Sequence, residues 1–267
     1  MISFDKFPGG KKKAVTMSYD DGMVFDKKLI EIFDKYGIKG TFHINSGFLG
    51  ASERKLKAEE IKEVYKNHEV AIHGVKHATL TNLKPQSMIA DVLEDRRAIE
   101  RIVGEPVCGM SYANGAFSDD VCEALKACGV VYSRTTQSTG KWRIPENFLK
   151  WHPTCHHKDA GPIVDRFLNF KYGSGYLLYI WGHSYEFDND NNWDLIERVC
   201  EKLGADEDIW FATNIEIYNY VKAVERIILS VDEDIMVNSS NIDIWFTKDG
   251  ETMKIGANET LEFRKEV

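Results

Sequence analysis

The sequence predicts an α/β fold: a distorted (β/α)7–8 barrel followed by a small β-rich C-terminal appendage. Between residues 14 and 224, short apolar runs alternate with segments of helical periodicity. Repeated βα units indicate parallel strands, and seven units within about 220 residues favour a barrel over an open sheet. A doubly wound open sheet is the alternative, although no Gly-x-Gly-x-x-Gly follows a strand to indicate a dinucleotide site.

Each unit begins with an apolar run that favours a strand and continues into a helical segment. The predicted strands span residues 14–18, 39–45, 69–73, 106–112, 130–135, 175–181 and 209–212. The predicted helices span residues 26–36, 58–67, 86–103, 119–128, 162–170 and 193–203, and a last one follows Thr213. Ser118 is a suitable N-cap, and Gly104 and Gly129 are natural helix ends. Thr213 and Glu216 form a capping box. Residues 136–161 show no clear periodicity.

The last 42 residues change character, and we predict two parts: residues 1–225 as the barrel and residues 226–267 as the appendage. Short β-like runs cover residues 227–231, 235–238, 242–246, 253–255 and 261–263. Asp249 and Gly250 predict a tight hairpin turn. A sheet of this size is too small to be stable alone, so we expect it to pack on the barrel.

Composition narrows the class of partner. The 267 residues carry a net charge of −8 without a basic stripe, which argues against nucleic acid and anionic membranes as partners. No apolar stretch approaches the roughly 20 residues that span a bilayer, and the N-terminus lacks the apolar core of a signal peptide. The five cysteines are odd in number and lack C-x-x-C spacing, which favours reduced thiols. These features predict a cytoplasmic protein.

Two adjacent carboxylates, Asp20 and Asp21, directly follow the first predicted strand. Active sites of barrels form at this end of the strands. Neighbouring side chains on an extended segment diverge, so the two acids can have different roles. The alternative is a solvated Asp-Asp-Gly turn.

Two histidines, His73 and His77, stand four residues apart where the third strand ends. Imidazoles at this spacing can converge on one metal ion. The alternative is one core and one surface histidine. With one aspartate they make three ligands and leave a fourth position open, the pattern of a catalytic zinc site. The other aspartate is then free to act as a base on water.

A third histidine, His183, ends the predicted strand 175–181 and can face the same pocket. A histidine there suits proton donation to a leaving group, and the alternative is a structural histidine bonded to a loop carbonyl. His43, in the middle of a strand, is expected to be a core histidine. Cys155, His156 and His157 suggest a second metal cluster, but adjacent side chains rarely chelate one ion, so a pocket-lining loop is expected.

Three motifs together resemble the polysaccharide deacetylases, carbohydrate esterase family 4, also called the NodB-homology family. The typical T-F-D-D-G stands here as Ser18-Tyr19-Asp20-Asp21-Gly22. The typical H-[ST]-x-x-H stands as His73-Gly74-Val75-Lys76-His77. The typical apolar strand that ends in histidine is residues 177–183. Their order and strand placement match, and the resemblance covers about residues 12–224.

The resemblance implies a role for each motif residue and a distorted (β/α) barrel as the fold. Asp20 would be the catalytic base and His183 the general acid. Asp21, His73 and His77 would bind a divalent metal. Zinc is the expected ion, and other divalent ions suit the same ligands.

The sequence departs from the family in its third and fourth motifs. In place of R-x-P-Y-G stand residues 111–115, with Ser111 at the arginine position, and the fourth motif is not recognisable. The family's tyrosine gives a backbone N–H to the oxyanion. Because a backbone donor survives side-chain change, the resemblance places this donor among Tyr112, Asn114 and Gly115.

The missing arginine leaves the catalytic aspartate without its partner. Arg134 lies near the end of the next predicted strand, 130–135, which opens on the same pocket of a barrel. We therefore expect Arg134 to reach in and pair with Asp20. The alternative is a surface arginine on a loop.

Three functions fit these residues. The first is a metal-dependent hydrolase of non-peptide amide bonds that removes acetyl groups from a carbohydrate. The second keeps the barrel and the metal but hydrolyses a cyclic amide or imide; the altered third motif and the missing signal peptide favour it. The third is a non-catalytic carbohydrate-binding protein, against which the full set of five motif residues argues.

Overall fold

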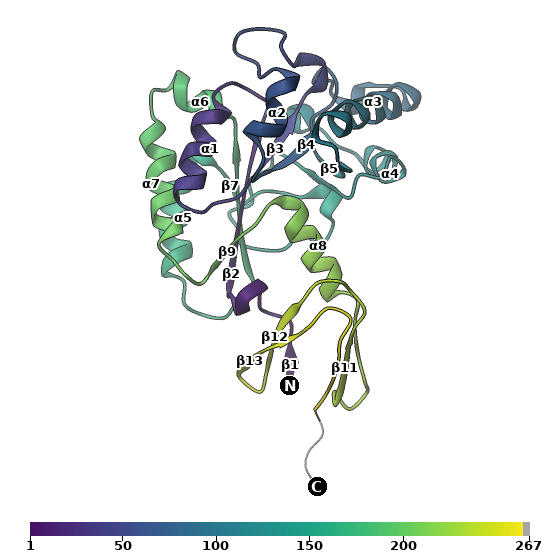
Figure 1. Cartoon of the computed structure of the whole chain (residues 1–267), viewed down its shortest axis with the longest axis vertical. Coiled ribbons are helices and arrows are strands. Elements are labelled where there is room, and N and C mark those ends of the chain that lie inside the picture. The colour runs from purple at the N-terminus through teal and green to yellow at the C-terminus, as the bar shows by residue number, and fades with distance from the viewer. Residues whose placement is uncertain (264–267) are drawn as a thin grey trace.

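The fold is organised around β2 (Lys13–Asp20), a central strand whose residues are all buried. A computed structural model describes residues 1–263 (Figure 1). On one side β2 pairs in parallel with β8 (Tyr176–Gly182). On the other it pairs with β3 (Gly40–Ile44), while its first three residues also pair with β9 (Ile209–Phe211).

Eight parallel strands make up the main sheet. The remaining four are β4 (Glu69–Ile72), β5 (Gly109–Ser111), β6 (Tyr132–Arg134) and β7 (Cys155–His156). The order is β6-β5-β4-β3-β2-β8-β7, with β9 beside β2. The sheet curls into a partial barrel, and an isolated bridge joins Arg134 at the end of β6 to Trp151. The predicted fold class, a distorted parallel barrel with a β appendage, is confirmed.

The helices cover the outside of the curled sheet. In Figure 1, α1, α5, α6 and α7 group on one side and α3 and α4 on the other. Their bounds are α1 (Asp26–Lys35), α2 (Ala58–Val64), α3 (Pro85–Val103), α4 (Asp119–Ala127), α5 (Ala160–Asn169), α6 (Ser184–Asn189), α7 (Trp193–Gly204) and α8 (Asn214–Val224). The predicted N-terminal caps are present. The Ser118 side chain accepts a hydrogen bond from the Val121 N–H at the start of α4, and Thr213 and Glu216 form the capping box of α8.

Two elements close to the site were not predicted. Strand β7 has only two residues and lies in the stretch that lacks periodicity. Its pairing with β8 makes it a strand, and the local sequence has no alternating pattern that would predict one. Helix α6 has only six residues and directly follows β8, in a segment that the sequence analysis left as a loop.

The C-terminal strands form two small antiparallel sheets. One contains β10 (Ile227–Leu229), β11 (Ile235–Asn238) and β14 (Thr260–Glu262); the other contains β12 (Ile244–Lys248), β13 (Glu251–Ile255) and the N-terminal β1 (Ile2–Ser3), which was not predicted. The predicted turn is present, with positive φ at Asp249 (50°) and Gly250 (91°). Buried Phe7, Tyr220 and Phe246 belong to one apolar cluster that joins these sheets to the barrel. Figure 1 shows the appendage at the end of the molecule where β2 begins.

All five cysteines are free, as expected for reduced thiols. Within residues 1–263, no helix combines the length and the apolar character that a membrane crossing needs.

A buried carboxyl group ties three helices together beside the site. Asp26 of α1 accepts hydrogen bonds from the hydroxyls of Ser184 in α6 and Tyr65 just after α2. Burial raises the pKa of Asp26 to about 7, which the two hydrogen bonds only partly offset. The folded protein therefore holds a proton here that the unfolded chain releases above pH 4.

We expect the contribution of Asp26 to stability to be lost as the pH rises from about 4 to about 7, and Asp26→Asn to remove this loss. The pKa difference sets an upper limit of about 4 kcal/mol on the contribution of Asp26. Burial also raises the pKa of Glu69 to about 7 and lowers the pKa of His73 to about 4, and these two groups act in opposite directions over the same range, so the test is the difference between the two proteins. Urea unfolding of both proteins at pH 5 and pH 7.5 measures the difference, and equal slopes would contradict this assignment.

Candidate active site and metal centre

The predicted site residues gather at the carboxyl ends of neighbouring parallel strands. Asp20 is the last residue of β2 and Arg134 the last of β6, while His73 directly follows β4 and His183 directly follows β8. Because parallel strands end at the same edge of a sheet, residues far apart in the sequence meet there.

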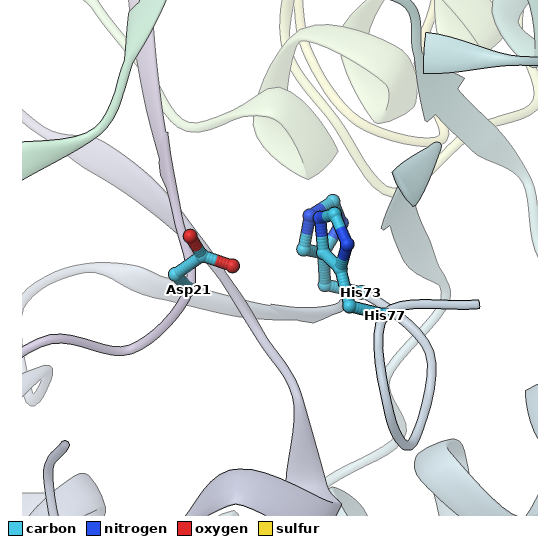
Figure 2. Close-up of side chains that lie close together, drawn as sticks. All are labelled: Asp21, His73 and His77. Atoms are coloured by element: carbon cyan, nitrogen blue, oxygen red, sulfur yellow. The ribbon is translucent and has the colours of Figure 1, made fainter. Parts of the chain in front are cut away.

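The candidate metal ligands Asp21, His73 and His77 converge. Their nearest ligand atoms all lie within 4.8 Å of one another, and Figure 2 shows the Asp21 carboxylate beside the two imidazole rings. The ring centroids of His73 and His77 are 4.7 Å apart. Asp21 (φ 84°) and His77 (φ 56°) both adopt the left-handed conformation. Side chains other than glycine rarely accept this strain except at functional sites.

His73 is prepared to act as a ligand. Its Nδ1 lies 2.9 Å from the carbonyl oxygen of Ser111 and 2.7 Å from its hydroxyl, which leaves Nε2 for a cation. Burial lowers the pKa of His73 to about 4, so the ring is neutral at physiological pH, as metal binding requires. Two imidazole nitrogens and one carboxylate are a donor set that fits zinc and similar divalent ions.

The loop that carries the two histidines is fixed from the neighbouring strand and helix. The Asn45 side-chain amide donates to the carbonyls of His73 and Gly74, at 2.8 and 2.9 Å. The buried carboxylate of Asp95 in α3 accepts hydrogen bonds from the backbone N–H groups of His73 and Ser46, at 3.0 and 2.9 Å. The loop therefore has its conformation before any ligand arrives.

Asp20 is buried and held through both carboxylate oxygens. Its Oδ1 lies 3.0 Å from Nδ1 of His43 and accepts from the Ser111 hydroxyl at 3.2 Å. Its Oδ2 accepts from Arg134 and lies 3.7 Å from Nε2 of His73. Burial pushes the pKa of Asp20 upward, but the charges of Arg134 and the nearby histidines outweigh burial and hold it well below its usual range. Asp20 is thus ionised at neutral pH.

Arg134 lies in the contact with Asp20 that the strand order led us to expect. Its side chain has no exposed surface, and its guanidinium carbon lies 4.3 Å from the centre of the Trp181 ring. The alternative, an arginine directed to solvent, is not what the structure has. Arg134 thus reaches Asp20 from β6, whereas the family arginine position, Ser111, lies on β5.

We expect Arg134→Lys to impair any reaction that uses Asp20, by about tenfold or more. A lysine keeps the charge but cannot reproduce the planar fork or its stacking on Trp181. Steady-state turnover measured together with thermal unfolding separates misplacement of Asp20 from unfolding. Unchanged turnover in a folded variant would show that Asp20 does not depend on the guanidinium.

His183 faces the charged centre and remains partly open to solvent. Its Nδ1 lies 3.6 Å from Oε2 of Glu186, one helical turn later, and its side chain is 20% exposed. Burial acts to lower the pKa of His183, but Glu186 and the negative charges of Asp20 and Asp21 outweigh burial and raise it. A raised pKa favours the protonated ring, which is the form that a proton donor needs.

Two of the three expected oxyanion donors must be corrected. The backbone N–H of Tyr112 donates to the carbonyl of Arg134, and that of Gly115 donates to the carbonyl of Tyr112. Both groups are therefore already engaged, and the Tyr112 hydroxyl is turned to the carbonyl of Leu149. Asn114 is the remaining candidate: it has a positive φ of 59°, and its side chain donates to Thr79.

The sequence analysis missed two residues of the site. His43 was expected to be an ordinary core histidine, yet it contacts Asp20 from the next strand, and its Nε2 is buried without a partner. The register of β2 and β3 aligns His43 with Asp20, and the sequence carries no signal for that register. Glu186 stands three residues after His183, a spacing that brings side chains together on a helix.

Comparisons with known proteins agree with this geometry. The polysaccharide deacetylase family model matches residues 8–133. A chitooligosaccharide deacetylase of Rhizobium leguminosarum bv. phaseoli is 27% identical over 121 residues, which cover 45% of this chain and 51% of that protein. The chain thus spans about half the length of the curated relative that it matches.

Solved structures show the same fold over most of the chain. A protein of the polysaccharide deacetylase type from Mycobacterium smegmatis superposes with a TM-score of 0.64 at 15% identity, covering 84% of this chain and 94% of that one. A family 4 acetyl xylan esterase from Clostridium thermocellum, solved with a cobalt ion, has a TM-score of 0.50 at 16% identity, covering 77% and 90%. The resemblance expected from the motifs is confirmed: the chain is similar to the polysaccharide deacetylases in sequence over residues 8–133 and in fold over most of its length.

Proposed function

We propose that this protein is a metal-dependent hydrolase of non-peptide amide bonds that removes acetyl groups from a carbohydrate. The observation that carries the proposal is the convergence of Asp21, His73 and His77 beside Asp20, a buried carboxylate kept ionised by Arg134. The similarity to a chitooligosaccharide deacetylase supports an N-acetylated sugar as the substrate. We further propose that residues 1–225 carry this activity and that residues 226–267 are an appendage.

Zinc is the ion that we propose for the Asp21, His73 and His77 site. The donor set of two nitrogens and one oxygen supports it, and the cobalt ion in the C. thermocellum esterase supports a divalent ion of this kind. A bound divalent ion would polarise the acetyl carbonyl and lower the pKa of a water molecule towards about 7.

The protein's own groups would move the protons. Asp20, ionised and held through both oxygens, would take a proton from the attacking water. His183, which has a raised pKa, would give a proton to the departing amine or alkoxide. The N–H of Asn114 would contribute to stabilising the negative charge that develops on the carbonyl oxygen.

A cyclic amide or imide is the second candidate substrate. The altered third motif favours it, because Ser111 and Asn114 replace the arginine and the tyrosine of the family motif. Tyr185, which could stack on a sugar ring in the first candidate, lies next to His183, with ring centroids 5.1 Å apart.

The test is a substrate panel presented to zinc-loaded protein. N-acetylated chitooligosaccharides, O-acetylated xylooligosaccharides and cyclic imides are compared by acetate release or ring opening. We expect acetate release from the chitooligosaccharides. Ring opening without acetate release would favour the second candidate. No turnover of any substrate by protein that retains zinc would contradict an enzymatic role for these compounds.

A further inference from the structure

A second group of metal-ligating side chains lies beside His183. His156 ends β7, His157 begins the short 3-10 helix that follows (His157–Asp159), and Glu186 lies in α6. Their nearest ligand atoms all lie within 4.8 Å of one another. The Nε2 atoms of His156 and His157 are 3.0 and 3.3 Å from the same oxygen, Oε2 of Glu186.

The two adjacent histidines converge, although adjacent side chains rarely chelate one ion. Consecutive side chains of a strand point to opposite faces. The chain turns at this point from β7 into the 3-10 helix, so the two rings lie together, with centroids 4.3 Å apart. Because of this turn, the Nε2 atoms of the two adjacent histidines both face the same carboxylate oxygen.

The position of His157 is built into the fold. Its side chain is only 1% exposed, and its ring stacks on Phe187, with centroids 4.1 Å apart. A Cβ added to Gly182 would lie 1.9 Å from Nδ1 of His157, so the glycine before His183 makes room for this ring. Nδ1 is buried without a hydrogen-bond partner, and Nε2 is the ring nitrogen that faces Glu186.

The separations suit a metal ion. Tetrahedral ligands with bonds of about 2.0–2.2 Å stand about 3.3–3.6 Å apart, close to the two nitrogen–oxygen distances. Lys158 approaches the other carboxylate oxygen, Oε1, at 3.5 Å, and leaves Oε2 to the histidines.

We propose that His156, His157 and Glu186 bind a second divalent transition-metal ion, of the zinc or cobalt type, separate from the ion at Asp21, His73 and His77. Nε2 of each histidine and Oε2 of Glu186 would be the ligands, and solvent would supply the rest. His183, whose Nδ1 lies 3.6 Å from the same Oε2, places this ion next to the proposed active site.

Metal stoichiometry tests the proposal. Full-length protein is stripped with chelator, loaded with zinc and passed through gel filtration, and bound zinc per chain is measured by elemental analysis. We expect two equivalents in the wild type and one in each of Glu186→Gln, His156→Ala and His77→Ala. The double variant His77→Ala/Glu186→Gln should retain none. Asp190→Asn, a change to an exposed neighbour whose side chain pairs with Lys158, is the matched control and should retain two.

The outcomes separate this proposal from the proposed function. One equivalent in the wild type, lost in His77→Ala and kept in His156→Ala, would overturn the second site even if acetate is released. Two equivalents with the expected losses would support it even if no acetate is released. Circular dichroism checks each variant, and His156→Ala, at a partly exposed position, serves if Glu186→Gln does not fold.

Discussion

Asp20→Asn is expected to lower acetate release by about 10²-fold or more while zinc stays bound at the Asp21, His73 and His77 site. An amide has the same shape as the carboxylate but cannot accept a proton, and loss of a general base costs at least this much. Asp21→Asn should instead bind zinc more weakly than the wild type, because the Asp21 carboxylate is a proposed ligand.

The variant also leaves Arg134 buried without its counter-charge, which destabilises a protein by about 3–5 kcal/mol. Turnover must therefore be compared at a temperature at which circular dichroism shows both proteins folded. Asp188→Asn, at an exposed position of α6, is the matched control and should keep full activity. Equal zinc loss in Asp20→Asn and Asp21→Asn would mean that both carboxylates are ligands and that the base lies elsewhere.

His183→Ala is expected to reduce turnover to a similar degree with zinc retained, and to change the pH profile. A proton donor must be protonated, so activity falls as the pH rises through its pKa. The wild-type profile should therefore have an alkaline limb that is set by His183. In the variant this limb should disappear. An unchanged alkaline limb would assign the proton donor to another group.

The fold was largely predictable because its signals are local. The capping box at Thr213 and the glycines that end helices depend only on neighbouring residues. Each predicted strand and helix is also marked by the spacing of the apolar residues within it. The placement of Asp20, His73 and His183 near one another followed from a topological rule, since parallel strands present their carboxyl ends at one edge.

What could not be predicted depends on contacts between distant segments. Strand β7 exists because β8 pairs with it, and its two residues have no period of their own. The convergence of His156 and His157 depends on a turn between them, and the role of His43 depends on the register of two strands. The Tyr112 N–H is unavailable for the same reason, since it donates to the carbonyl of Arg134 on the neighbouring strand.

Acetate release from N-acetylchitooligosaccharide during a zinc titration of chelator-stripped protein tests the central claim most directly. The wild type should be inactive when stripped and regain activity as zinc is added, whereas His77→Ala should stay inactive at the same zinc concentrations. Full activity in the stripped wild type, or recovery in His77→Ala equal to that of the wild type, would contradict a metal-dependent reaction at Asp21, His73 and His77.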